Sequence, residues 1–286
     1  MEKKIKKENI VITIVASLGF LVVYLAVSNL IPLGIQLFYY FTYSELRIVD
    51  NEAFTQHVRT QMVANVNYIG ISIFMVFLAI LFVIFKIKKT SLLKRIRWNP
   101  VSKQVYALVA VFAISNVIAL NFLMDFLLPQ SWVQGTSEYA DMITSANGGL
   151  FLTIFAVVFV GPFGEEVLMR GLITTRLMER LPLWFAVAFP TILFGVGHSA
   201  GGMGQIIGTT VTGLVFALVF IWTNSLRTAV LAHSLNNLLS AILHLGALKS
   251  AMSLPFQLTA GIIGLLIAVF TASKIYSLYS SKNISE

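Results

Sequence analysis

The feature that most constrains this chain is a series of about eight apolar runs, each long enough or nearly long enough to cross a bilayer. A transmembrane helix needs about 20 consecutive, mostly apolar residues. Only 11% of the residues are charged, whereas a soluble domain carries roughly 25%. The sequence therefore predicts an all-α fold, a polytopic bundle of about eight transmembrane helices. The expected spans cover residues 10–32, 66–86, 104–128, 149–171, 183–198, 204–223, 226–247 and 255–275. The aromatic residues from Leu37 to Tyr43 indicate that the first continues as an interfacial piece, and residues 44–65 are the expected polar outer loop.

Basic residues lie at the ends of these runs. The N-terminus carries a group of lysines and the loop 86–103 is rich in lysine and arginine, whereas the loop 129–147 has neither. By the positive-inside rule, both termini are expected to be cytoplasmic. The net charge of +8 then reflects topology, and the expected partner is the lipid bilayer rather than nucleic acid. The loop 86–103 is interpreted as a topology determinant lying on anionic headgroups, with a docking site for an acidic partner as the alternative.

No internal repeat, linker or low-complexity tract divides the chain. We expect residues 1–147 to form three N-terminal spans with their loops, and residues 148–286 to form a catalytic transmembrane core. The motifs described next all fall within 161–237. Because the chain has no cysteine, disulfides and thiolate metal sites are excluded.

The first polar group interrupts the fourth apolar run, where the sequence reads Gly-Pro-Phe-Gly-Glu-Glu-Val-Leu-Met-Arg from Gly161 to Arg170. Ionisable side chains are costly in a bilayer and usually face a bundle interior or a wet cavity. On a helix, Glu166 and Arg170 lie at i and i+4 and can pair. Glu165 is rotated by about 100° from Glu166 and stays available for another task. The Gly161–Pro162 pair is expected to break or bend the helix.

Two further polar groups follow, Phe194-Gly-Val-Gly-His198 and His233-Ser-Leu-Asn-Asn237. On a helix, His233, Asn236 and Asn237 share one face. Glu165 lies 17 residues before Pro182 and His198 lies 16 residues after it. At about 1.5 Å per residue, an antiparallel hairpin turning at Pro182 would bring both side chains to the same depth, where they could meet.

These residues suit water-mediated hydrolysis. A buried glutamate can act as a general base toward water with a histidine beside it, and a second histidine with an amide N–H can hold an oxyanion. The same residues Glu165, His198 and His233 could instead hold zinc with an open water position, although the His-Glu-x-x-His arrangement is absent. We place the metal-free reading first, so no cofactor is expected and zinc is the alternative.

Taken together, the three motifs resemble those of the CAAX-protease and bacteriocin-processing (CPBP, or Abi) family of intramembrane proteases. The family pattern is Glu-Glu-x-x-x-Arg, then Phe-x-x-x-His, then His-x-x-x-Asn, and all three parts are complete and in order here. The resemblance covers roughly residues 148–245. It implies an endopeptidase with the fold of the type-2 CAAX prenyl proteases.

The resemblance also implies roles for individual residues. Glu165 and His198 would activate water, while His233 and Asn237 would form the oxyanion hole. The supporting residues would be Glu166, Arg170, Phe194 and Asn236. Proteins of this family are often described as metalloproteases, and the sequence leaves that point open.

The expected substrates are peptides or membrane proteins, and the expected location is a bacterial cytoplasmic membrane. Bacterial relatives are linked to bacteriocin self-immunity and to peptide-pheromone maturation, and the sequence does not choose between these roles. Two other classes of function remain as alternatives. One is a non-catalytic scaffold or immunity protein that binds a sensor or receptor. The other is a transporter, which would be expected to show an internal repeat.

Overall fold

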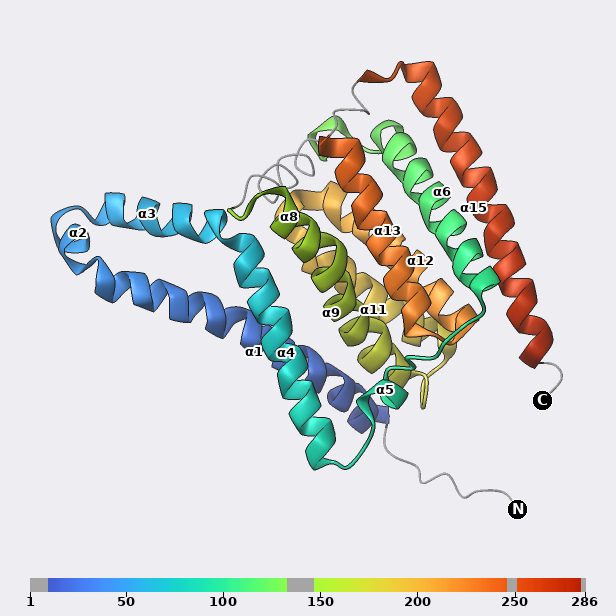
Figure 1. The fold of residues 1–286 in the computed structure, drawn as a ribbon, viewed down its shortest axis with the longest axis horizontal. Helices are drawn as coiled ribbons and strands as arrows, with labels where there is room; N and C mark the ends of the chain where they lie inside the picture. Colours follow the sequence, from blue (N-terminus) through green and yellow to red (C-terminus); the bar gives the residue numbers. More distant parts are fainter. Residues whose placement is uncertain (1–9, 133–146, 246–250, 284–286) are drawn as a thin grey trace.

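The computed structural model describes residues 10–132, 147–245 and 251–283, and in these ranges every regular element is helical (Figure 1). The N-terminal part comprises α1 (Ile10–Thr42), α2 (Ser44–Val49), α3 (Asn51–Ala64), α4 (Val66–Ile87), α5 (Leu92–Arg95) and α6 (Lys103–Leu127). A composite helix follows, made of α8 (Gly149–Ile154), η1 (Phe155–Val160), α9 (Gly161–Glu166), η2 (Val167–Thr174) and α10 (Thr175–Leu177). The remaining elements are α11 (Leu183–Gly197), η3 (Ser199–Gly201), α12 (Gly202–Thr223), α13 (Leu226–Leu245) and α15 (Leu254–Asn283).

The prediction of a polytopic all-α bundle is confirmed, and the chain is an integral membrane protein. Among the described residues, 6 helices are long and apolar enough to cross a membrane. They are Ile10–Thr42, Val66–Ile87, Lys103–Met124, Gly149–Leu177, Ser199–Thr223 and Leu254–Tyr279. The other two expected spans correspond to α11 and α13. Helix α11 has only 15 residues, which is shorter than a full membrane span. Helix α13 is long enough, but its polar side chains lower its mean hydropathy.

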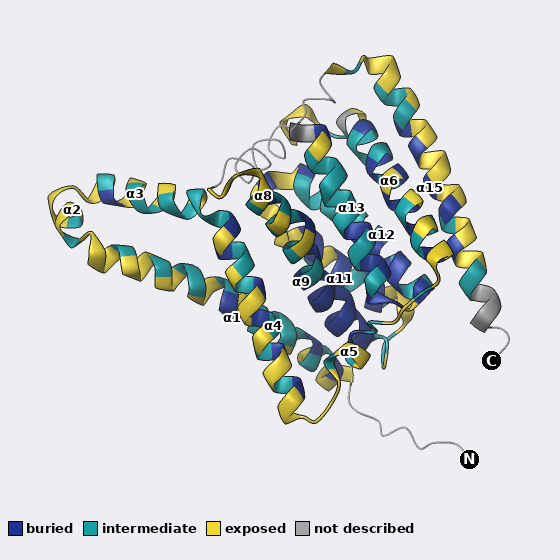
Figure 2. Cartoon of the chain, viewed as in Figure 1, coloured by how far each residue is buried: buried dark blue, intermediate teal, exposed yellow. Residues whose placement is uncertain are grey.

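The N-terminal region differs from the expected span and polar loop. Helix α1 does not end near residue 32 but continues for 33 residues, with Pro32 inside it. The expected loop 44–65 is largely helical, because Asp50 caps α3 by accepting a hydrogen bond from the Ala53 N–H at 2.9 Å. Figure 2 shows that the end of α1, together with α2 and α3, extends away from the bundle and is largely exposed.

Two apolar clusters hold the bundle together. The first joins α4 to η2, α10, α11 and the start of α13, with Phe77, Leu172 and Leu177 fully buried. The second joins α6, α12, α13 and α15, with Phe216 and Ile275 at its centre. Helices from both sides of residue 147 contribute to each cluster, so the division of the chain at residue 147 stays a prediction.

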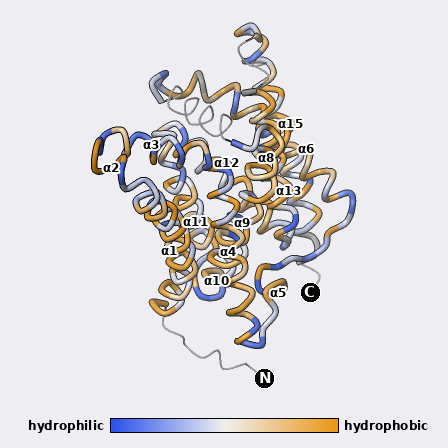
Figure 3. The backbone as a smooth tube through the Cα atoms, turned by 60° about the vertical axis from the view of Figure 1, so that its left-hand side comes forward, coloured by the Kyte–Doolittle hydropathy of each residue, from blue (hydrophilic) through white to orange (hydrophobic). Residues whose placement is uncertain are grey.

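The basic loop between α4 and α6 is folded against one end of the bundle. Arg95 and Arg176 both pair with Glu179 in the turn before α11. Arg97 donates to Asn224 Oδ1 at 2.7 Å, in the turn between α12 and α13. Burial, followed by the charge of Arg95, lowers the pKa of Arg97. The basic loops therefore gather at one end, as predicted, and Figure 3 shows polar segments at the two ends of the apolar bundle.

Candidate active site

The site is built on the composite helix that carries the two glutamates. The chain stays helical through Gly161 and Pro162, so the expected break does not occur. Instead, the turns on both sides, η1 and η2, have the wider π-helical hydrogen bonding. In an α-helix, a proline ring collides with the carbonyl four residues before it, and the wider turn of η1 lies where that carbonyl would be. Such π-turns are frequent at functional sites.

Glu166 and Arg170 form a buried ion pair, as predicted from their spacing. Their side chains are 0% and 1% exposed, and Arg170 NH1 donates to Glu166 Oε1 at 2.9 Å. Arg170 NH2 donates to the Gly213 carbonyl on α12. A Cβ atom at Gly213 would lie 2.9 Å from the Phe194 ring, so glycine is what allows the helices to approach here. The pair ties η2 to α12 in the centre of the bundle.

His233 lies between the two glutamates. Its Nδ1 is 2.9 Å from Glu166 Oε1, and its Nε2 is 3.6 Å from Glu165 Oε2. Because Glu166 Oε1 already accepts from Arg170, we assign the donor of the shorter contact as His233 Nδ1–H. Phe216 stacks on the imidazole with ring centroids 4.4 Å apart. The imidazole is thus fixed in rotation and Nε2 faces Glu165.

Glu165 and Glu166 have different environments although they are adjacent. The Glu165 side chain is 25% exposed, whereas Glu166 is fully buried. Glu166 Oε2 is buried and has no hydrogen-bond partner among the described residues. Glu165 is therefore the carboxylate that remains accessible, and Glu166 is the one that holds other groups in place.

His198 lies at the C-terminal end of α11. Its Nδ1 is 2.8 Å from the Phe194 carbonyl, and since a carbonyl only accepts, Nδ1 carries the proton. In the neutral imidazole, Nε2 is then an acceptor. The Phe194 ring packs against both His198 and His233, with centroids 4.7 and 5.6 Å apart. The described contacts do not join His198 to Glu165, which is paired with His233 instead.

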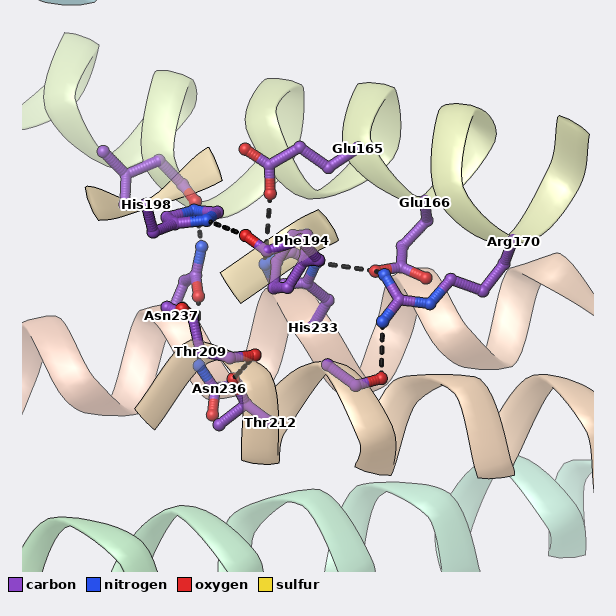
Figure 4. Close-up of polar contacts among 12 residues, drawn as sticks. Glu165, Glu166, Arg170, Phe194, His198, Thr209, Thr212, His233, Asn236 and Asn237 are labelled. Carbon is purple, nitrogen blue, oxygen red and sulfur yellow. Dashed lines mark hydrogen bonds and ion pairs between the residues drawn. The ribbon is translucent and has the colours of Figure 1, made fainter. Parts of the chain in front are cut away.

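Asn237 lies one turn beyond His233 on α13. Its Nδ2 donates to the Val157 carbonyl in η1 at 2.8 Å, and its Oδ1 accepts from Asn236 Nδ2 at 3.1 Å. Figure 4 shows His198 and Asn237 at one end of the site and Arg170 at the other, with Glu165 and His233 between them. The three sequence motifs therefore converge on one place.

The same geometry tests the zinc alternative. Within the described part of the chain, no three His, Cys, Asp or Glu side chains gather closely enough to hold a metal ion. In this arrangement Glu165, His198 and His233 do not form a ligand set, so no step below passes through a metal.

Three contributors to the site were not foreseen from the sequence. They are the carbonyls of Val157 and Gly213 and the ring of Phe216, which contact Asn237, Arg170 and His233 respectively. Backbone carbonyls leave no mark in a sequence. The glycine at position 213, on an apolar span, was the available signal for a close helix approach.

Fold and site together define a polytopic α-helical membrane protein with glutamate, histidine and asparagine side chains gathered inside its bundle. A family model described as "Type II CAAX prenyl endopeptidase Rce1-like" matches residues 147–239. The matched segment contains all three motifs, so the resemblance predicted from them is confirmed for that part of the chain.

A curated relative agrees with this match. The chain is 26% identical over 114 residues to a protein of Bacillus subtilis (strain 168) named "Putative membrane peptidase YdiL". The alignment covers 40% of this chain and 46% of the relative, which is about half of the relative's length. No solved structure is significantly similar to the chain. The comparisons thus point to membrane peptidases as the class of relatives.

Proposed function

We propose that the chain is an intramembrane endopeptidase that hydrolyses peptide bonds of membrane-associated or peptide substrates. The observation that carries this proposal is the accessible carboxylate of Glu165 beside His233, whose other nitrogen is held by the buried Glu166–Arg170 pair. An accessible glutamate can take a proton from water, and an oriented imidazole beside it can hold the oxyanion that forms. The similarity to membrane peptidases supports the same reading.

In the proposed reaction, Glu165 removes a proton from a water molecule as the water oxygen attacks the carbonyl carbon of the scissile bond. His198 Nε2, left as an acceptor by the bond from Nδ1 to Phe194, orients this water. The carbonyl oxygen becomes an oxyanion. When the carbon–nitrogen bond breaks, Glu165 returns its proton to the leaving amine, and the products are a carboxylate and an amine.

The oxyanion is held by His233 and Asn237. Because His233 Nδ1–H donates to Glu166, His233 Nε2 donates only when the imidazole is doubly protonated. The proposed reaction uses the ring in that form, with Nδ1–H on Glu166 and Nε2–H on the oxyanion. The second N–H of the Asn237 amide, beyond the one given to Val157, supplies the other donor. Removing one such donor typically costs about 10²–10³-fold in rate.

Glu166 and Arg170 act as positioning residues in this mechanism. They fix the orientation of His233 without touching the substrate. A cytoplasmic membrane of a bacterium, with both termini cytoplasmic, is the proposed location. Bacteriocin self-immunity or the maturation of a peptide pheromone is the proposed physiological setting.

The test is cleavage of a panel of quenched fluorescent peptides by the purified protein in liposomes. Glu165→Gln keeps the shape of the side chain and removes the base, so cleavage should be lost. Glu179→Gln, in a partly exposed ion pair far from the site, serves as the matched control and should cleave normally. Treatment with a chelator should leave cleavage unchanged.

Each other outcome is informative. Cleavage by the Glu165→Gln protein would refute the proposed base. Loss of cleavage with chelator would restore the zinc alternative. If a cellular phenotype of the wild-type protein persisted in Glu165→Gln, the non-catalytic scaffold or immunity protein would become the better explanation.

A further inference from the structure

The end of α1 together with α2 and α3, residues 30–64, forms an arm that the proposed mechanism does not use. Figures 1 and 2 show it extending sideways from the bundle. At its tip, Ile48 and Val49 are 78% and 86% exposed. Two such apolar side chains, next to each other at the end of an arm, indicate a surface that is covered by something other than water.

The length of α1 limits how the arm can lie. Its 33 residues extend about 50 Å at about 1.5 Å per residue, whereas the hydrocarbon core is about 30 Å thick. The helix is apolar along its length and has no acidic residue in its first turn and no basic residue in its last. To keep it within the core, α1 must tilt by about 50° from the bilayer normal. Its end then reaches the opposite interface far to the side of the bundle.

The other end of the arm is fixed at the level of that interface. Ala64 accepts a backbone hydrogen bond from Asn147 at 2.6 Å, just before the composite helix begins. One turn further, Asn67 donates to Thr153 at 2.9 Å. Helices α4 and α8 both start here, so α3 leaves the bundle at a membrane surface. Helix α4 crosses the membrane from this surface to the basic loop 86–103, so the arm and the basic loop lie at opposite membrane surfaces.

The arm has a polar side and an apolar side. Helix α3 packs on α1 through its half-buried face, where Phe54 contacts Tyr40 and His57 contacts Tyr43. The polar face of α3 is exposed and includes Glu52, Gln56, Arg59 and Thr60. The exposed apolar side chains of the arm include Leu30, Leu33, Leu37, Phe38, Phe41, Ile48 and Val49. Tyrosines between a polar and an apolar layer are typical of a membrane interface.

We propose that this arm is embedded in the lipid leaflet opposite the basic loop 86–103. Helix α3 lies along the interface with its polar face toward water. The tip of α2 is immersed at the boundary between headgroups and acyl chains, so that Ile48 and Val49 contact lipid. The polar segment between the first two spans is therefore a membrane-bound element and not a loop in the aqueous phase. This inference is independent of the proposed peptidase activity.

Because the chain has no cysteine, single cysteines can be introduced and spin-labelled without further changes. We would label Val49→Cys at the tip and Gln56→Cys on the polar face of α3, in the full-length protein in liposomes. Collision with oxygen, which concentrates in the bilayer, is compared with collision with a water-soluble nickel chelate. The expected result is a label at residue 49 that oxygen reaches at least several-fold better than nickel, with the reverse preference at residue 56.

Two results would overturn the proposal. Preferential access of nickel to the label at residue 49 would place the tip in water. A label at residue 49 that neither reagent reaches would mean that protein covers the tip, and in a purified sample that protein is a second copy of this chain. Far-ultraviolet circular dichroism of both labelled proteins confirms that the helices are retained.

Discussion

Removing the guanidinium of Arg170 tests the most buried interaction in the bundle. In Arg170→Met a side chain of similar length replaces the cation, which leaves Glu166 without its charged partner at 0% exposure. Leaving one partner of a buried ion pair alone costs about 3–5 kcal/mol. The Gly213 carbonyl also loses this side-chain donor. We therefore expect a loss of at least about 3 kcal/mol in the free energy of unfolding.

The loss is measured by equilibrium unfolding in mixed micelles with increasing SDS, followed by tryptophan fluorescence. Arg176→Met is the matched control, since Arg176 pairs with Glu179 at 2.7 Å but both side chains are partly exposed. Such a pair contributes about 0–1 kcal/mol. In the double variant Glu166→Gln and Arg170→Met, the buried charge is gone and most of the stability should return. The reasoning fails if Arg170→Met is no more destabilised than Arg176→Met.

Two further changes test the packing around the site by the same unfolding measurement. In Gly195→Ala, the new Cβ would lie 2.8 Å from the Ile206 carbonyl on α12. Helices α11 and α12 must then separate, and the free energy of unfolding should fall by about 1–3 kcal/mol. Gly197→Ala, where no atom lies within 4 Å, should change stability by less than about 0.5 kcal/mol, and equal effects of the two would contradict the packing. Asn67→Leu removes the donor to Thr153 and should lower the free energy of unfolding by about 1–2 kcal/mol. Adding Thr153→Val removes the unpaired acceptor and should restore part of that stability. If the second change restores nothing, the hydrogen bond does not contribute as proposed.

The sequence predicted those parts of the site that depend on one helix alone. Glu166 and Arg170 pair because four residues bring side chains to the same face, and that spacing is visible in the chain. The contact between His233 and Glu166 was not foreseen, because it depends on how two helices are rotated relative to each other. The expected contact of Glu165 with His198 required the correct depth, which the hairpin provides, but also the correct rotation.

The same limit applies to the fold. Apolar runs predicted the approximate positions of the helices well, because the bilayer sets their length, although only 6 of the described helices are long and apolar enough to span. The first apolar run alone ended near residue 32, and only the aromatic residues from Leu37 to Tyr43 indicated that it continues. In the structure α1 runs through Pro32 to Thr42, and tyrosines that contact α3 stabilise the extension. The π-turns of η1 and η2 were also missed, because hydrogen-bond register in a helix leaves no periodic signal that differs clearly from the α-helical one.

The two adjacent glutamates explain how one helix can supply both a fixed and a reactive carboxylate. Consecutive residues on an α-helix differ by about 100° in direction. In this bundle, one direction points to Arg170 and His233, where the carboxylate is buried and its Oε1 accepts from both side chains. The other points to a partly open space beside His233. Since His233 contacts both carboxylates, a change at Glu166 reaches Glu165 only through this imidazole. A variant such as Glu166→Gln should therefore lower the rate of cleavage while retaining the base, whereas Glu165→Gln removes the base itself.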